Sequence, residues 1–165
     1  AGELQVRGHT LMLGYYQRSR ADSFTADGFF PTGDLCVEDE EGFLRFIGRL
    51  HEMIKTTGAN VSPREVELVL GRFPGVREAF VMGIPDELRG ESVIAVVVPD
   101  EHAVPKTDKL EKFLGAELSA YKRPRQIFFR PQSDIPRTAS GKPDLPHLKQ
   151  QVQQWFAQEN TGSKE

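Results

Sequence analysis

The alternation of apolar and polar residues changes character near residue 50. Before that point, alternating stretches predict strands at residues 2–8 and 42–47, and the acidic run at residues 38–42 predicts a solvated hairpin turn. Beyond residue 60, helical and strand-like stretches follow one another. We therefore expect a β-rich segment followed by a mixed segment of helices and strands.

Three segments have the spacing of amphipathic helices. The first begins at Ser62, because a serine followed three residues later by Glu65 forms a capping-box pattern, and it ends at Pro74-Gly75. The second runs from about residue 107 to residue 118. The third follows residue 144, and its apolar face consists of Leu145, Leu148, Val152 and Phe156.

Strands are expected at residues 76–82, 92–98 and 126–130, with a turn at Pro85-Asp86 between the first two. The stretch at residues 92–98 is apolar enough to lie at the centre of a sheet. The predicted fold class is therefore α+β, with a small three-stranded sheet and helices packed on it.

Composition and charge exclude several classes of protein. The chain has 21 Lys and Arg against 24 Asp and Glu, a net charge of -3, and the basic residues are scattered, which argues against a nucleic-acid partner. No apolar run is long enough for a transmembrane segment, and Cys36 has no second cysteine to pair with, so a cytoplasmic location is expected. The chain opens Ala-Gly-Glu without an initiator methionine, and we expect it to lie inside a longer protein.

The clearest candidate for chemistry is Lys142, in the loop sequence IPRTASGKPD at residues 135–144. An ammonium group on such a loop can neutralise a phosphate or a carboxylate. A Walker phosphate loop is excluded, because Pro136 and Pro143 stand where that motif needs Gly and Ser or Thr. On loop composition alone, the alternative of a solvated surface lysine is favoured.

Two further segments fit a nucleotide site. In FFPTGDL, Asp34 follows a Thr-Gly pair that we expect to form a tight turn, and its carboxylate can accept both hydroxyl protons of a ribose, or it simply belongs to a turn. Arg49 can bind a phosphate or ribose, or pair with nearby carboxylates. Gly58 would let the backbone approach a ligand, or only serve a turn. The histidines are too dispersed to predict a metal site.

Taken in order, these segments resemble the C-terminal part of the adenylate-forming superfamily, most of all the acyl-CoA synthetases. The resemblance covers nearly the whole chain, from GELQVRGHTLMLGYY through FFPTGDL, GRLHEMIKTTGANVSPREVE and YKRP to IPRTASGK. It implies that a small-molecule carboxylic acid is joined to AMP with the use of ATP and Mg²⁺, and that the acyl group then passes to coenzyme A.

The resemblance also implies roles for individual residues. Lys142 matches the lysine that bridges carboxylate and phosphate oxygens during adenylation, Asp34 the acid that binds the ribose hydroxyls, and Arg49 an arginine that contacts the nucleotide. His51 falls at the hinge about which the small domain alternates between two poses, where the family usually has Asp or Lys. The loop that lines the coenzyme A tunnel in the second pose is matched by Thr57, Gly58 and Ala59.

In domain terms, the resemblance implies that residues 1–50 are the β-rich end of the large AMP-binding domain, that residues 51–157 are the mobile C-terminal α+β domain, and that residues 158–165 are a polar, frayed tail. The phosphate loop, the acyl pocket and the acidic magnesium motif would lie in the missing N-terminal domain, so the chain alone is expected to be inactive. Two alternatives stay open: an adenylation domain that loads a carrier protein, and a stand-alone module that binds a nucleotide or a partner.

Overall fold

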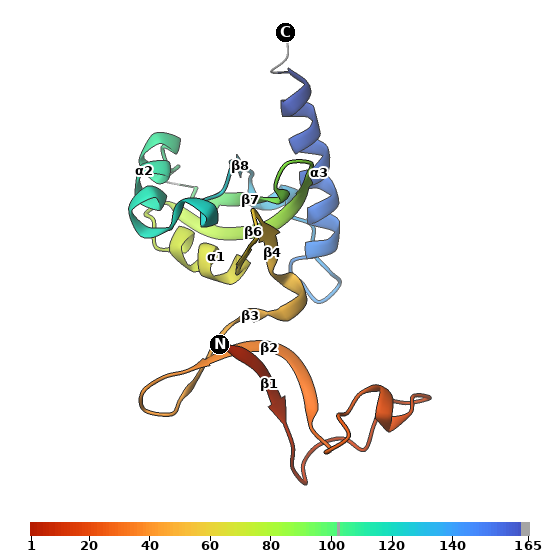
Figure 1. Ribbon diagram of the computed structural model, residues 1–165. Coiled ribbons are helices and arrows are strands. Elements are labelled where there is room, and N and C mark those ends of the chain that lie inside the picture. Colours follow the sequence, from red (N-terminus) through yellow and green to blue (C-terminus); the bar gives the residue numbers. More distant parts are fainter. Residues whose placement is uncertain (102, 163–165) are drawn as a thin grey trace. The chain divides into compact units, whose positions relative to one another are not determined.

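A computed structural model describes residues 1–101 and 103–162, and the chain divides into two compact units, Ala1–Glu52 and Met53–Glu165. Each unit is built on a sheet of its own (Figure 1). Within the described residues, no helix is both long enough and apolar enough to cross a membrane.

The first unit is a three-stranded antiparallel sheet in the order β1, β2, β3. Strand β1 spans Gly2–Val6, β2 spans Phe30–Glu38 and β3 spans Leu44–Arg49. The acidic run does form the hairpin turn between β2 and β3, because the Asp39 carboxylate accepts hydrogen bonds from the N–H groups of Glu41 and Phe43. One short 3₁₀ helix, Arg20–Asp22, lies between β1 and β2, and another, Leu50–Glu52, follows β3.

The expected tight turn at Thr32-Gly33 is instead a bulge inside β2. Glu3 pairs with Leu35 and Gln5 with Pro31, so residues 32–34 stand opposite a single residue of β1. Gly33 adopts φ +74°, which a residue with a side chain reaches only at a cost. The chain therefore changes direction locally without leaving the sheet.

The second unit has a five-stranded sheet in the order β5, β4, β7, β6, with β8 also paired to β7. The three predicted strands are present as β6 (Val76–Asp86), β7 (Gly90–Pro99) and β8 (Gln126–Phe129). The sheet is wider than predicted because β4 (Ile54–Thr56) and β5 (Ala59–Val61) form a short hairpin that joins it. Strands of three residues are too short to show a period in the sequence.

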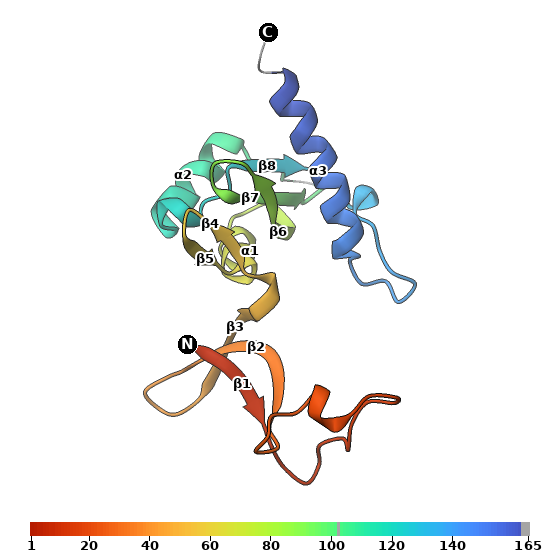
Figure 2. The same cartoon turned by 45° about the vertical axis from the view of Figure 1, so that its right-hand side comes forward.

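Strand β7 is the centre of this sheet, as expected, and its two faces pack on different helices. One face contributes Val93, Ala95 and Val97 to a core with α1 (Pro63–Gly71) and α2 (Thr107–Glu117). The other contributes Ile94, Val96 and Val98 to a core with α3 (Leu145–Gly162). In both views α3 lies across the sheet from α1 and α2 (Figures 1 and 2).

The start of α1 and both ends of α2 follow the predictions, whereas α1 ends at Gly71, before the predicted stop at Pro74-Gly75, and α3 extends beyond its prediction. The Ser62 hydroxyl accepts a hydrogen bond from the Glu65 N–H and caps α1. Helix α3 continues to Gly162, past residue 158 where the polar tail was expected to begin. Residues 163–165 of that predicted tail lie outside the described residues.

The predicted turn at Pro85-Asp86 is wrong, because both residues belong to β6 and the chain reverses over residues 87–89. The Asp86 carboxylate shapes this turn by accepting hydrogen bonds from the N–H groups of Leu88 and Arg89. Its second oxygen lies 2.5 Å from the Ser92 hydroxyl and 2.6 Å from Arg125 Nη1. Asp86, whose side chain is 7% exposed, thus caps the β6–β7 turn and joins it to Arg125 at the start of β8.

Replacing this cap tests its share of the stability. Asp86→Asn should lower the free energy of unfolding by about 1 to 2 kcal/mol at neutral pH, because the charge-assisted bonds from Ser92 and Arg125 weaken. The Ser92 hydrogen bond is the main cause that holds the pKa of Asp86 below its ordinary value of 3.8. The carboxylate therefore stabilises fully above that value, and its contribution disappears as the pH falls through the folded-state pKa.

Urea unfolding of the chain at a series of pH values from neutral down to about 2.5 would measure this. The gap between wild type and Asp86→Asn should close below the ordinary pKa of 3.8. The exposed neighbour Glu87 supplies a matched control, since Glu87→Gln should leave the stability nearly unchanged. A gap that stays constant down to the acid end would contradict the role of the ionised carboxylate.

Candidate functional site

Asp34 and Arg49 are brought together as cross-strand partners of β2 and β3. Arg49 Nε lies 3.0 Å from Asp34 Oδ1, and Arg49 Nη1 donates a longer hydrogen bond of 3.5 Å to the carbonyl of Thr32. The Asp34 side chain is 26% exposed and that of Arg49 is 48% exposed. The pair is therefore accessible to a ligand and is held by the sheet rather than by a flexible loop.

The bulge in β2 sets the position of Asp34. The Thr32 hydroxyl donates to the carbonyl of Leu4 at 2.7 Å and accepts from the N–H of Asp34 at 3.1 Å. The Gly33 N–H donates to Glu3 Oε1 at 3.0 Å. These bonds tie the bulge to β1, and the pairing of Asp34 with Arg49 ties it to β3.

His51 packs against this bulge. A β-carbon added to Gly33 would lie 3.0 Å from His51 Cε1, so the imidazole lies directly over the glycine and would have to shift to admit a side chain there. His51 lies in the 3₁₀ turn Leu50–Glu52, which follows β3 and ends the first unit. The residue predicted for the hinge therefore contacts the residue next to Asp34, and its role as a hinge stays a prediction.

Lys142 lies in a closed hairpin rather than in a flexible loop. Thr138 N–H donates to the carbonyl of Lys142 and Gly141 N–H donates to the carbonyl of Thr138, each at 2.8 Å. Gly141 adopts φ +80°, which is the left-handed glycine of a three-residue hairpin loop with a bulge. At its base, the Asp144 N–H donates to the carbonyl of Pro136. This glycine fixes the direction of the chain just before the lysine.

The ammonium of Lys142 is available for a partner. Lys142 is exposed, and within residues 1–101 and 103–162 its side chain makes no hydrogen bond or ion pair. The hairpin projects from the second unit just before α3 (Figure 2). A lysine presented in this way remains free to neutralise an anion.

Of the predicted tunnel loop, Thr57 and Gly58 form the tight connection between β4 and β5, and Ala59 is the first residue of β5. Thr56 pairs with Ala59, and the two residues between them have positive φ, +49° at Thr57 and +79° at Gly58. This is the signature of a type I′ turn. The N–H of Thr57 donates to the carbonyl of Arg89 at 2.9 Å, so the hairpin is joined to the β6–β7 turn.

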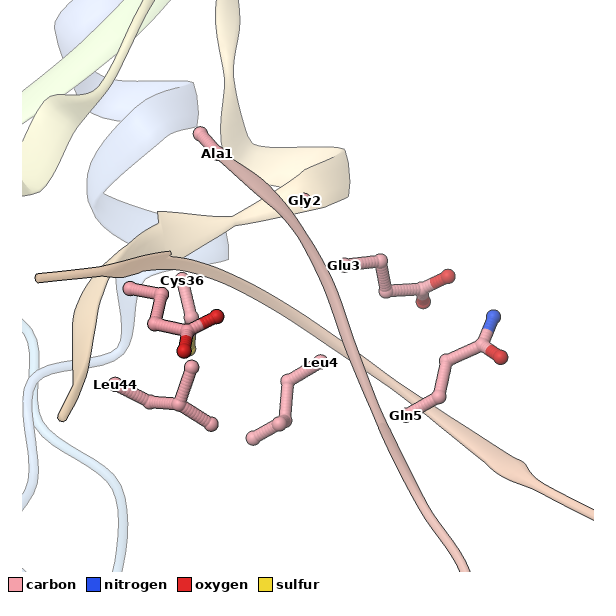
Figure 3. A pocket seen from close by; sticks show the side chains of 8 residues that line it. Ala1, Gly2, Glu3, Leu4, Gln5, Cys36 and Leu44 are labelled. Carbon is pink, nitrogen blue, oxygen red and sulfur yellow. The ribbon is translucent and has the colours of Figure 1, made fainter. Parts of the chain in front are cut away.

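A hollow of about 490 Å³ lies along β1, apart from the Asp34 and Arg49 pair. Figure 3 shows Leu4, Cys36 and Leu44 on one side of the strand and Glu3 and Gln5 on the other. Its only charged lining side chains are acidic, so it does not suit a phosphate. In the part of the chain that the structure describes, no group of three or more His, Cys, Asp or Glu could hold a metal ion.

Several supporting residues are not recognisable from the sequence. Glu3 lies 30 residues from Gly33 in the sequence. Glu78 binds Arg137 in the lysine hairpin, residues 136–144, and lies 59 residues from it in the sequence. No motif marks Glu78, and nothing in the GELQVRG segment indicates that Glu3 contacts Gly33. Thr32 was within reach of prediction, because it stands in the FFPTGDL segment immediately before the bulge.

The chain is similar in sequence and in fold to known proteins. The sequence profile of the AMP-binding enzyme C-terminal domain matches residues 65–142. A long-chain-fatty-acid–CoA ligase of Salmonella typhimurium is 42% identical over 143 residues, which cover 86% of this chain and 25% of the relative. A sulfoacetate–CoA ligase of Cupriavidus necator is 38% identical over 143 residues, which cover 86% of this chain and 28% of the relative.

Among solved structures, ATP-bound MatB from Rhodopseudomonas palustris superposes with a TM-score of 0.82 at 34% identity, over 92% of this chain and 30% of that protein. The chain thus spans about a quarter to a third of the length of these relatives. The sheet with helices on both faces is the fold of their C-terminal domain, and the chain belongs to the adenylate-forming, AMP-binding enzymes through that domain.

Proposed function

We propose that this chain is the C-terminal portion of an ATP-dependent acid–CoA ligase, an acyl-CoA synthetase that forms an acyl-adenylate and then an acyl-CoA. The observation that carries the proposal is Lys142, an exposed ammonium without a partner among the described residues, held on a closed hairpin. The names of the two ligases above support the choice of coenzyme A as acceptor. The cytoplasmic location expected from the sequence is part of the same proposal.

In the proposed reaction, Asp34 and Arg49 bind the nucleotide. A carboxylate has lone pairs for two hydroxyl donors, and only one oxygen of Asp34 faces Arg49, so the other can accept from a ribose diol. The guanidinium of Arg49 can bind ribose or phosphate oxygens with its remaining N–H groups. Mg²⁺ would neutralise phosphate charge when bound, and we assign its ligands to the missing N-terminal domain.

Lys142 would act on the first half-reaction. A carboxylate oxygen of the acid forms a bond to the α-phosphorus of ATP, and the bond from that phosphorus to the pyrophosphate oxygen breaks. The bond formation brings the anionic carboxylate against the anionic phosphate, and negative charge builds on the α-phosphate oxygens and on the leaving pyrophosphate oxygen in the transition state. An ammonium positioned between them stabilises that charge more than the charge of the separate reactants.

The acyl acceptor is tested on the intact enzyme that contains this chain. Acid-dependent exchange of pyrophosphate into ATP, followed by acyl transfer to coenzyme A across a panel of acids of graded length, is the expected result. Exchange without transfer to coenzyme A would contradict the ligase proposal, and transfer to a carrier protein would then identify the adenylation-domain alternative. Calorimetry of the isolated chain with AMP and coenzyme A tests the stand-alone alternative.

Removal of the Lys142 ammonium should slow the first half-reaction and leave the second unchanged. Lys142→Ala in the intact enzyme should slow acyl-adenylate formation by about 2 to 4 kcal/mol, roughly 30- to 1,000-fold, as loss of an oxyanion-stabilising donor does. Thioester formation from supplied acyl-adenylate should persist. Single-turnover assays of each half-reaction give the two rate constants.

A suitable control for that variant is Lys109→Ala, which removes an exposed lysine of α2. It should change neither half-reaction. Equal losses in both half-reactions of Lys142→Ala would count against the division of labour proposed for this lysine.

The loop proposed to line the coenzyme A tunnel carries backbone strain. Thr57 is β-branched, yet it holds φ +49°, a conformation that such residues rarely adopt. Strain of this kind persists where the surrounding structure fixes the backbone, and it gathers at functional loops. The hydrogen bond from the Thr57 N–H to the carbonyl of Arg89 supplies part of that constraint.

Relief of this strain should stabilise the chain. Thr57→Asn keeps a polar side chain and tolerates positive φ, so the free energy of unfolding in urea should rise by roughly 0.5 to 1 kcal/mol. Thr57→Val is the matched control, because it keeps the β-branched shape and should give no gain. If Thr57→Asn stabilises the intact enzyme and also slows only thioester formation, the strained turn serves the second half-reaction. A slower adenylation step would argue against that role.

A further inference from the structure

Arg137 connects the lysine hairpin to the sheet. Its Nη2 donates to both carboxylate oxygens of Glu78 in β6, at 3.0 and 3.1 Å. Its Nη1 donates to the carbonyl of Gly141 at 3.1 Å, and Gly141 is the residue immediately before Lys142. One guanidinium therefore holds a strand of the sheet and the backbone of the catalytic candidate at the same time.

This link is the hairpin's anchor. The backbone bonds among residues 136–144 fix the internal shape of the hairpin, but they join it only to itself. Among the residues that the structure describes, the bond from Arg137 to Glu78 is the only hydrogen-bonded or ionic link from residues 137–143 to another element. Without it, a hairpin of unchanged shape is free to pivot about its base at Pro136 and Asp144.

The anchor has the features of a specific contact rather than an incidental surface pair. The Arg137 and Glu78 side chains are 30% and 29% exposed, so both are partly shielded from water. The planar guanidinium holds its N–H groups in fixed directions, so that Nη2 bridges both oxygens of Glu78 while Nη1 donates to the carbonyl of Gly141, an arrangement that a lysine ammonium does not fix. Glu78 also accepts a hydrogen bond of 3.4 Å from Gln132, in the 3₁₀ turn Gln132–Asp134 that leads into the hairpin.

We propose that Arg137, held by Glu78, is a positioning residue for Lys142 in the adenylation step. By fixing the carbonyl of Gly141, it fixes the peptide from which Lys142 projects, and the ammonium meets the reacting oxygens without a search over hairpin orientations. Misplacement of a catalytic group by about 1 Å can cost roughly 100-fold in rate, so an anchor of this kind matters even though it touches no substrate. The inference rests on the proposed function of Lys142.

The test uses the intact enzyme and single-turnover rates for each half-reaction. Arg137→Gln should slow acyl-adenylate formation by about 10- to 100-fold and leave thioester formation from supplied acyl-adenylate within about twofold. Glu78→Gln should cause a loss in the same half-reaction, and the double variant should be no slower than the worse single variant. Arg137→Lys keeps the charge but lacks the two nitrogens that reach Glu78 and Gly141 together. Its rate of acyl-adenylate formation should lie between those of wild type and Arg137→Gln, and this variant decides the outcome if Arg137→Gln does not fold.

A second background separates positioning from a general structural effect. In Lys142→Ala, the further change Arg137→Gln should alter adenylation by less than about twofold, because there is no lysine left to position. The proposal would be overturned if Arg137→Gln slowed adenylation by the same factor in the wild type and in Lys142→Ala. It would also be overturned if Arg137→Gln slowed adenylation and Glu78→Gln did not. The latter pattern would mean that Arg137 contacts the substrate directly.

The controls distinguish this proposal from the one it rests on. Arg72→Gln breaks another ion pair of the same unit, the 2.8 Å contact with Glu117, and should leave both half-reactions unchanged. If Lys142→Ala itself leaves adenylation unaffected, the role of Lys142 fails. If Lys142→Ala slows adenylation and Arg137→Gln does not, only the positioning role of Arg137 fails.

Discussion

The second unit depends on the burial of one strand, β7, on both of its faces. Residues 93–98 are six apolar residues in succession, and the pleat divides them alternately between two cores. A strand of this kind cannot be stable unless helices cover both faces, and here α1 and α2 cover one face while α3 covers the other. The placement of every element that carries a candidate residue in this unit follows from that requirement.

The burial of β7 also fixes the position of the hairpin that carries Lys142. Leu148 and Val152 anchor α3 on one core, and the Asp144 carboxylate caps its first turn by accepting from the N–H of His147. The start of α3 is thereby fixed, and so is the base of the hairpin that precedes it. On the other side, Glu78 belongs to β6, which pairs with β7 along its length. The hairpin is thus held at its base by the helix and along its side by the sheet, two elements that meet only because β7 is buried between two layers.

The candidate residues stand where regular structure is interrupted. Gly33 precedes Asp34, Gly141 precedes Lys142, and both glycines have positive φ. A left-handed residue turns the chain, so that the next side chain leaves the direction that the pleat or the loop would otherwise impose. At Thr57 the same conformation is imposed on a residue that does not favour it. The regular elements supply rigidity, and these single residues supply direction.

The sequence predicts the regular elements well and the interruptions poorly. The helices α1 and α2 and the strands β6, β7 and β8 have enough residues for a period of 3.6 or 2 to be recognised. The hairpin of β4 and β5 is decided by tertiary contacts, including the pairing of Thr56 with Gly90, and has no local signal of comparable strength. Asp86 was predicted in a turn because Pro-Asp is a turn pair, yet its carboxylate caps the following turn from inside a strand. Motif order selects Asp34, Arg49 and Lys142 as candidates, and their roles stay predictions. The parts played by Glu3 and Glu78 depend on contacts 30 and 59 residues apart in the chain, which no local pattern encodes.

The candidate residues of the two units differ in how their charges are satisfied, and the difference suits the proposed reaction. Asp34 and Arg49 pair with each other across one sheet, so this carboxylate and guanidinium are already ordered before a nucleotide arrives. Lys142 belongs to the other compact unit and has no partner among the described residues. A lysine that had its own carboxylate would have to break that pair each time it approached a reacting phosphate, at a cost in binding free energy. Under the proposed function, the nucleotide-binding pair gains from being ordered in advance, and the lysine gains from being free on a rigid support.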